Sequence, residues 1–312
     1  MAGLNFKNRV AIITGAGRGL GRAYALLLAQ KGARLVINDP GFAPNGAGGD
    51  AGPAEEVVRE IHQAGGEALA CTDTVATPEG GKAIVEIALK NFGKIDILIH
   101  NAGNTRHAAF REMTNADFDA VLDVHLRGAF HVGQPAFAHM ADAGYGRIVL
   151  TGSIAGLYGE AKVVNYSVAK AGLIGLCNVM ALDGADKGIR CNVILPAALT
   201  RLAEGRDTSA YPPMGPEMVA PVVAWLAHES CSISGEMLIS AAGRLARAYV
   251  AETSGLYRSD WTMESINEQI EHIRESAAPV VFPVLPHGFN DHLGYAFAMA
   301  RQGGSRGGGD VN

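Results

Sequence analysis

The chain has 312 residues, of which 48% are hydrophobic, 18% charged and 6% aromatic, a composition typical of a globular protein with a large buried core. Its formal net charge is -5, and the sequence contains no block of lysines and arginines. Both features argue against nucleic acid as a partner. No stretch reaches the roughly 18 uninterrupted apolar residues that cross a bilayer, so no membrane partner is expected. The ligand should be a small molecule.

The cysteines and the chain ends carry few signals. The cysteines lie far apart and form no C-x-x-C pair, so they indicate neither a zinc site nor a thioredoxin-type redox motif, and no metal site is expected. The first residues contain no signal-peptide pattern. The last three, DVN, differ from the peroxisomal address SKL. These features predict a reduced, cytoplasmic protein.

Short β-branched segments alternate with helical patterns along the first 245 residues. The expected strands are residues 10–14, 34–39, 67–72, 95–102, 146–153, 189–196 and 236–241. They are almost continuously apolar, as strands are when helices cover both faces of their sheet. The pattern predicts an α/β fold with a doubly wound, parallel, seven-stranded sheet.

Two polar loops and a C-terminal extension depart from this alternation. Residues 39–56 form a Gly- and Pro-rich insertion, and residues 198–217, after the sixth strand, are the expected substrate lid. We assign residues 1–245 to a nucleotide-binding catalytic domain and residues 246–312 to the extension. The extension has a helix expected over 262–277 and a Gly-rich end, GGSRGGGDVN, that we expect to be disordered.

The sequence TGAGRGLG begins at Thr14, where the first strand meets a helix. Gly15, Gly19 and Gly21 suit a tight turn, the approach of a pyrophosphate to the backbone, and close packing of helix on sheet. The free N–H groups at the helix N-terminus suit the phosphates. The motif predicts a dinucleotide site, and the alternative is a tight turn without a ligand.

Two acidic residues follow strands on the expected adenosine side. Asp39 ends the second strand roughly 20 residues after the glycine loop, where a carboxylate binds a ribose diol and repels a 2′-phosphate. It therefore favours NAD over NADP, with a helix cap or turn residue as the alternative reading. Asp73, at the end of the third strand, is expected near the adenine amine.

The sequence YSVAK places Tyr166 and Lys170 four residues apart, on one face of a helix. An ammonium beside a phenol lowers the pKa of the phenol from about 10 toward neutrality, so Tyr166 can carry a proton. Ser153 ends the fifth strand at the carboxyl edge of the sheet, where ligands bind in such folds. The three residues predict a site that acts on a substrate oxygen.

Over residues 5–245 the sequence resembles the short-chain dehydrogenase/reductase family. The family motifs T-G-x-x-x-G-x-G, N-N-A-G and Y-x-x-x-K are matched by TGAGRGLG, HNAG and YSVAK. The resemblance implies a Rossmann-fold, NAD(P)-dependent oxidoreductase in which Tyr166 is the acid/base, Lys170 binds the nicotinamide ribose and Ser153 orients the substrate. The expected cofactor-binding residues are Gly15, Arg18, Gly19, Leu20, Gly21, Asp39, Asp73, Thr74, Asn101, Ala102, Gly103, Tyr166, Lys170, Pro196, Leu199 and Thr200.

One position departs from the family pattern. His125 stands where an asparagine usually completes a proton relay, and we include it among the candidate catalytic residues. The surrounding VHLRG, with GRAYAL near the N-terminus, resembles the dehydrogenase part of peroxisomal multifunctional enzymes. That subgroup implies a (3R)-3-hydroxyacyl-CoA dehydrogenase; the alternative is a 17β-hydroxysteroid or other cyclic-alcohol dehydrogenase. A homodimer or homotetramer is expected through helices within residues 118–143 and 165–188.

Three other functions are compatible with parts of the sequence: a serine hydrolase, a metalloenzyme and a nucleotide-binding module without catalysis. A serine hydrolase is disfavoured because Thr151 stands where the G-x-S-x-G elbow requires glycine. A metalloenzyme is disfavoured because His287 and His292 lack an obvious third metal ligand. A nucleotide-binding module without catalysis is the remaining alternative, and the intact Ser153, Tyr166 and Lys170 argue against it.

Overall fold

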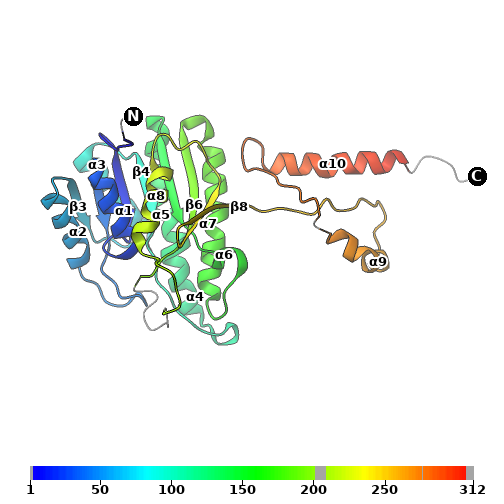
Figure 1. Ribbon diagram of the computed structural model, residues 1–312, viewed down its shortest axis with the longest axis horizontal. Helices are drawn as coiled ribbons and strands as arrows, with labels where there is room; N and C mark the ends of the chain where they lie inside the picture. The colour runs from blue at the N-terminus through cyan, green and yellow to red at the C-terminus, as the bar shows by residue number, and fades with distance from the viewer. Residues whose placement is uncertain (1–2, 201–208, 276, 307–312) are drawn as a thin grey trace, which may run out of the picture. The chain divides into compact units, whose positions relative to one another are not determined.

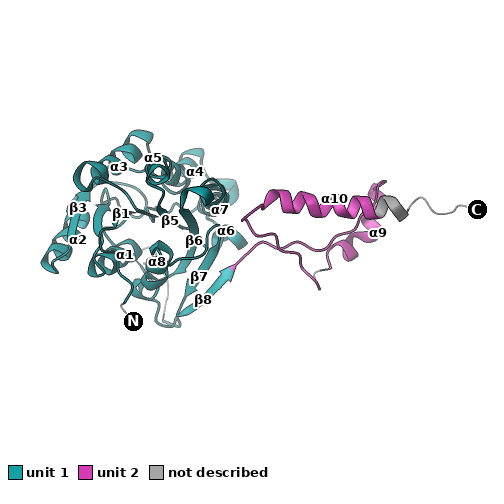
Figure 2. Cartoon of the chain, turned by 90° about the horizontal axis from the view of Figure 1, so that it is seen from above, with its two compact units in different colours: residues 1–247 teal, residues 248–312 magenta. Residues whose placement is uncertain are grey.

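The computed structural model describes residues 3–200, 209–275 and 277–306. The chain divides into two compact units, Met1–Arg247 and Ala248–Asn312, which Figure 2 colours separately. The first unit contains the whole alternation of strands and helices. The expected domain boundary after residue 245 stays a prediction, because compactness alone does not define a domain.

The first unit is built on one sheet of eight strands in the order β3-β2-β1-β4-β5-β6-β7-β8, which Figure 1 shows side by side. Neighbouring strands from β3 to β7 are parallel. The chain order reverses between β1 and β4, and in such sheets ligands bind outside the carboxyl ends of the strands at this point. The strands are β1 (Val10–Thr14), β2 (Arg34–Asn38), β3 (Glu67–Cys71), β4 (Ile97–His100), β5 (Gly146–Thr151), β6 (Ile189–Ala197), β7 (Met237–Ala241) and β8 (Arg244–Ala248).

All seven expected strands are present, with ends shifted by at most two residues, and the doubly wound α/β fold is confirmed. The strand count differs because β8 follows β7. Ala242 and Gly243 join these strands with φ angles of 47° and 81°. A two-residue hairpin turn requires this left-handed conformation, so β8 turns back along β7.

Helices cover both faces of the sheet (Figure 2). One face carries α3 (Pro78–Phe92), α4 (Asn115–Leu122), α5 (Gly128–Ala143) and α7 (Val164–Asp183). The other carries α1 (Gly19–Gln30), α2 (Gly52–Gln63) and α8 (Ala220–Ala227). The π-helical turn η2 (Asp123–Arg127) joins α4 to α5, and the short α6 (Ala155–Tyr158) follows β5. This is the layering of a doubly wound fold.

Local sequence determines where these helices begin and end. The Thr77 and Thr114 hydroxyls accept hydrogen bonds from the backbone N–H groups of Gly80 and Asp117, each at 3.1 Å, and so cap α3 and α4. Gly93 and Gly144 end α3 and α5 in the left-handed conformation that glycine adopts without strain.

The hydrophobic core holds the strand ends in fixed positions. Every residue of β1 and of β5 is buried. Ile13, Leu35 and Ile97 of the sheet pack with Tyr24 and Leu28 of α1 in one cluster. Side chains at the carboxyl ends of the strands therefore rest on a rigid support, which a binding site needs.

The second unit contains α9 (Met263–Ile273) and α10 (Phe289–Arg306). The helix expected over 262–277 corresponds to α9, which begins with a capping box formed by Thr262 and Ser265. Residues 303–306 belong to α10, and the disorder expected from residue 303 onward stays a prediction. The rest of the Gly-rich end lies outside the described residues.

Within the second unit, side chains connect segments that are far apart in sequence. Glu252 forms an isolated β bridge with Val280, and its Oε2 lies 3.1 Å from Nε2 of His292. The Tyr295 hydroxyl donates to the carbonyl oxygen of Ser254 at 3.3 Å. His292, once considered as a metal ligand, therefore has a carboxylate partner.

Candidate active site

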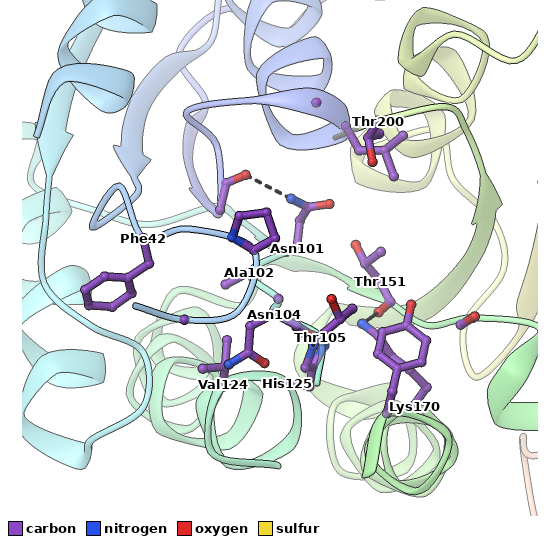
Figure 3. Close-up of a pocket in the computed structure, with 18 of the residues that line it drawn as sticks. Phe42, Asn101, Ala102, Asn104, Thr105, Val124, His125, Thr151, Lys170 and Thr200 are labelled. Atoms are coloured by element: carbon purple, nitrogen blue, oxygen red, sulfur yellow. Dashed lines mark hydrogen bonds between the residues drawn. The ribbon is translucent and has the colours of Figure 1, made fainter. Parts of the chain in front are cut away.

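A cleft of about 600 Å³ opens at the carboxyl ends of the strands. It is lined by the glycine loop, by the loop after β2, by the segment after β4 and by residues of α7. Figure 3 draws side chains from these segments around one cavity. The order reversal between β1 and β4 thus coincides with a cavity.

The glycine loop follows the expected geometry. Gly15 and Gly19 have φ angles of 63° and 54°, and a Cβ at Gly15 would lie 2.7 Å from Cα of Ala102. A Cβ at Gly21 would lie 2.2 Å from the Gly15 carbonyl oxygen, so Gly21 allows close packing although it does not line the cleft. Arg18, the N-cap of α1, provides no side-chain cap, which leaves the first N–H groups of the helix for a ligand.

Asp39 lines the cleft beside the glycine loop, with 8% of its surface exposed. One carboxylate oxygen accepts the N–H of Gly17 at 2.9 Å and the other accepts that of Gly41 at 2.8 Å. Each oxygen keeps a second lone pair for a hydroxyl donor. Thr74 lines the cleft here, whereas Asp73 is absent from its described lining and its carbonyl accepts a hydrogen bond from Asn38.

Thr14, His100 and His125 connect β1, β4 and η2. His100 Nε2 lies 3.2 Å from the His125 carbonyl oxygen, which only accepts, so the proton resides on Nε2. His100 Nδ1 then accepts from the Thr14 hydroxyl at 3.1 Å. The Thr14 oxygen in turn accepts the N–H groups of Asn101 and Ala102, each at 3.1 Å. Burial lowers the pKa of His100 to about 3, which keeps the ring neutral.

Tyr166, Lys170 and Ser153 come together at the other end of the cleft. Lys170 is buried, its Nζ donates to the carbonyl oxygen of Thr151, and it lies 5.5 Å from the centroid of the Tyr166 ring. Figure 3 shows Lys170 beside Thr151 at this end. The structure therefore brings together the three residues that the sequence nominated, two from α7 and Ser153 from the segment that follows β5.

The protonation of this group differs from the sequence-based expectation. Burial raises the pKa of Tyr166; a hydrogen bond with Ser153 opposes the shift and the Glu160 carboxylate adds to it. Burial also lowers the pKa of Lys170 to about 7. The expected lowering of the Tyr166 pKa by Lys170 is therefore wrong for the chain by itself: desolvation by burial is the largest cause of the shift, and the group that opposes it is Ser153, not Lys170.

His125 lies in the π-helical turn with its ring edge-on to Tyr166, the centroids 5.2 Å apart. Its Nε2 is 2.8 Å from the Asn104 carbonyl oxygen and 3.0 Å from the Asn104 nitrogen. Its Nδ1 is buried without a hydrogen-bond partner. A Cβ at Gly103 would lie 2.5 Å from the His125 ring, so only glycine fits there. Burial, followed by the charge of Lys170, holds the pKa of His125 well below its usual value.

The remaining expected cofactor residues also lie on the cleft. Asn101 donates its side-chain amide to the Gly15 carbonyl at 3.0 Å, as Figure 3 shows. Residues 201–208 of the expected lid lie outside the described residues, but Tyr211 and Met214 of that loop line the cleft. Lining residues from the expected set include Gly15, Arg18, Gly19, Leu20, Asp39, Thr74, Asn101, Ala102, Gly103, Pro196, Leu199 and Thr200.

Sequence reasoning missed several lining residues. Phe42 and Pro44 come from the inserted loop, which the sequence identified as a loop but not as a wall of the site. Arg106 and Thr105 follow the HNAG motif and carry no signal of their own. Thr151 was considered only as evidence against a hydrolase, yet its carbonyl binds Lys170.

The described part of the chain carries neither a metal-site cluster nor a membrane-spanning helix. It contains no group of three or more His, Cys, Asp or Glu side chains arranged to hold a metal ion. It also contains no helix with both the length and the apolar character to span a bilayer.

Comparison with known proteins gives consistent matches. Residues 9–208 match the family model described as short chain dehydrogenase. The sequence is 44% identical to peroxisomal multifunctional enzyme type 2 of Drosophila melanogaster over 253 residues, 81% of this chain and 42% of that protein. The chain thus spans less than half of that relative.

Two solved structures resemble this one closely. Full-length peroxisomal multifunctional enzyme type 2 from Drosophila melanogaster matches with a TM-score of 0.78 and 34% identity, over 96% of this chain and 50% of that one. A short chain dehydrogenase from Mycobacterium avium matches with a TM-score of 0.77 and 34% identity, over 88% of this chain and 99% of that one.

Proposed function

Because the chain belongs to the short chain dehydrogenase family, we propose that it is an NAD-dependent oxidoreductase that interconverts a secondary alcohol and a ketone. One observation carries the proposal: a single cleft joins the glycine loop and Asp39 at one end to Ser153, Tyr166 and Lys170 at the other. The rival, a nucleotide-binding module without catalysis, accounts for the first end alone.

The cleft fits a dinucleotide. The N–H groups at the start of α1 lack a side-chain cap and suit a pyrophosphate. The Asp39 carboxylate suits a ribose diol and opposes a 2′-phosphate, which supports NAD over NADP. The exposed Arg18 lines the same end and would favour a phosphate instead.

Cofactor preference tests this assignment. We expect calorimetry to give much tighter binding of NADH than of NADPH, and Asp39→Ala to narrow the difference because the repulsive charge is gone. Arg18→Ala added to Asp39→Ala should weaken NADPH again. Equal binding of both cofactors by the unmodified chain would refute the preference.

A nicotinamide held in the cleft would supply a hydride acceptor in oxidation and a hydride donor in reduction. Tyr166 removes the hydroxyl proton in the oxidation direction and returns it in reduction. Ser153, which hydrogen-bonds Tyr166, holds the same substrate oxygen. Lys170, fixed by the Thr151 carbonyl, keeps further N–H donors for a ribose. Since the deprotonated phenol is the base, oxidation should accelerate as pH rises.

We propose that His125 supports Tyr166 as a neutral ring. With the proton on Nε2 it donates to the Asn104 carbonyl, and with the proton on Nδ1 it accepts the Asn104 N–H, so either tautomer keeps one backbone bond. Nδ1 can therefore present a lone pair or a proton to the site without movement of the ring. His125→Phe should lower turnover more than it weakens cofactor binding; equal effects on both would argue for packing alone.

For the substrate we propose a (3R)-3-hydroxyacyl-CoA, with a 17β-hydroxysteroid or other cyclic alcohol as the alternative. The first choice is supported by the names of the multifunctional relatives and by the VHLRG sequence around His125. Reduction of NAD, followed by the absorbance of NADH, should be compared across hydroxyacyl-CoAs, hydroxysteroids and cyclic alcohols. No turnover of any of these with normal NADH binding would favour the non-catalytic module.

We further propose a cytoplasmic homodimer or homotetramer. Phe130 of α5 and Val179 of α7 are 50% and 54% exposed, which suits helices that pack against a second copy. Light scattering should give a multiple of the chain mass, reduced to one chain by Val179→Arg. The peroxisomal names of relatives make fractionation of cells the test of compartment.

A further inference from the structure

The loop of residues 40–50 and the segment of residues 104–107 line the cleft and are bonded to each other. The N–H of Thr105 donates to the Pro44 carbonyl at 2.9 Å. Nε of Arg106 donates to the Asn45 carbonyl at 3.3 Å. One wall of the adenosine end is therefore joined to the segment that leads toward the catalytic residues.

The loop is closed by its own backbone. The N–H of Asp50 donates to the Pro40 carbonyl at 3.0 Å, and that of Ala43 to the Ala47 carbonyl at 2.9 Å. Gly41 has a φ of 72°, and a Cβ there would lie 1.7 Å from the Asp50 carbonyl oxygen. A loop closed in this way moves as one body, so a ligand at its base also affects its tip.

Arg106 extends the connection toward Tyr166. Its Nη1 lies 2.8 Å from the Asp117 carboxylate, and its own carbonyl accepts the Asn165 side-chain amide at 3.1 Å. The Asn165 amide also donates to the Asp117 carbonyl at 3.0 Å. The Asn165 side-chain oxygen accepts the N–H of Tyr166 at 2.8 Å, and Asn165 is fully buried. Arg106 thus lies between the loop tip and the first turn of α7.

We propose that Arg106 is a positioning residue that couples nucleotide binding at loop 40–50 to the placement of Tyr166. The inference rests on the proposed function, since it requires a nucleotide at the adenosine end. A nucleotide beside Asp39 and Phe42 fixes the loop; the loop tip holds Arg106; and Arg106, through Asn165, fixes the start of α7. By linkage, the same coupling makes an ordered active site bind the nucleotide more tightly.

ADP-ribose tests the coupling because it fills the adenosine end without a nicotinamide ring. Hydrogen exchange should be followed by mass spectrometry at residues 40–50, 104–107 and 163–168, with and without ADP-ribose. In the unmodified chain we expect slower exchange at all three segments. Arg106→Met keeps much of the side-chain volume but loses the side-chain bonds to Asn45 and Asp117, whereas the backbone bonds of Thr105 and Arg106 remain. In this variant we expect protection at 40–50 and reduced protection at 163–168.

Two further variants complete the experiment. Arg106→Lys keeps a cation for Asp117 but has one donor group on a flexible stem, so it should fold normally and still lose protection at 163–168. Arg111→Met is the matched control, because Arg111 lies just beyond residues 104–107, 87% exposed at its side chain, and should behave as the unmodified chain. NADH should bind Arg106→Met about 5- to 10-fold more weakly.

The outcomes separate this proposal from the proposed function. If ADP-ribose and NADH do not bind the unmodified chain, the proposed function fails and the coupling with it. If both bind and the two Arg106 variants keep full protection at 163–168, the coupling alone is refuted. A structural role without coupling would slow or speed exchange equally with and without ADP-ribose.

Discussion

A buried cation lies at each end of strand β5, and the two cations differ in how many hydrogen bonds they donate. At the amino end, Arg147 donates to four backbone carbonyls at 2.7 to 3.3 Å and lies 4.6 Å from the centroid of the Tyr145 ring. At the carboxyl end, Lys170 donates to the carbonyl of Thr151. The arginine is bonded on all sides, whereas the lysine keeps donors in reserve.

Unpaired polar atoms are concentrated near the cleft, at the carboxyl ends of the strands. In the part of the chain that the structure describes, six buried side-chain polar atoms have no hydrogen-bond partner, and four of them belong to cleft-lining residues. Buried polar groups are normally paired, so a cluster of unpaired ones marks a place where stability was given up for binding. These four residues are Asn38, Asn104, His125 and Thr151.

The largest expected effect is on chemistry at the carboxyl end. Tyr166→Phe keeps the ring against His125 and removes the proton carrier, so turnover should fall about 1,000-fold. The dissociation constant of NADH should change less than about twofold. Steady-state rates and calorimetry measure the two quantities, and near-normal turnover would show that Tyr166 is not the acid/base.

At the amino end the expected effect is on stability. Arg147→Met removes the Arg147 donors from four carbonyls, of which those of Gly188 and His228 keep a backbone N–H, and should lower the free energy of unfolding by about 3 kcal/mol. Denaturant unfolding measures it, with the exposed Arg59→Met as control. Equal stability of the two variants would mean that the Arg147 hydrogen bonds at the amino end of β5 do not stabilise the fold.

The opposite sign is expected for Lys170. Its folded pKa of about 7 lies below its ordinary value, so the unfolded chain binds the proton more readily and burial of the ammonium opposes folding. The penalty is complete below pH 7 and disappears as pH rises toward the ordinary value. Lys170→Met should therefore stabilise the chain by about 2 kcal/mol near pH 6 and progressively less above pH 7. If Lys170→Met destabilised the chain at pH 6, the proposed difference between a stabilising Arg147 and a destabilising Lys170 would be wrong.

The smallest expected effect is on the stability of the fold at low pH, through His100. The folded pKa of His100 is about 3, below its ordinary value, so its contribution to stability is present above about pH 6.5 and is lost as pH falls toward 3. His100→Asn removes this contribution. Between pH 6 and 4 the unmodified chain should lose about 1 kcal/mol per pH unit more than the variant. Parallel pH profiles in thermal melts would exclude His100 as a source of acid sensitivity.

The sequence was sufficient where a function depends on local geometry. Gly15 and Gly19 need left-handed φ angles, Asp39 needs a strand end, and Tyr166 with Lys170 needs only a helical spacing, so each leaves a short-range signal. The β strands were predictable because apolar runs covered on both faces have few alternatives.

The sequence was insufficient where pairing is between distant segments. The bond from Arg106 to Asn45 joins residues 61 positions apart, and neither residue type announces a partner. The pKa of Tyr166 was misjudged because spacing reveals the neighbouring lysine but not the depth of burial. The hairpin to β8 was missed because Ala242 is a poor signal for a left-handed turn.

The contact between Gly103 and His125 restricts the order in which this site can change. A methyl group at position 103 would lie 2.5 Å from Cε1 of the His125 ring, and Gly103 does not have a positive φ that would itself exclude alanine. A smaller side chain at position 125 would remove the obstacle. Mutational libraries should therefore recover alanine at 103 only in clones that have already replaced His125. Substitution at 125 followed by 103 is then tolerated, whereas the reverse order is not.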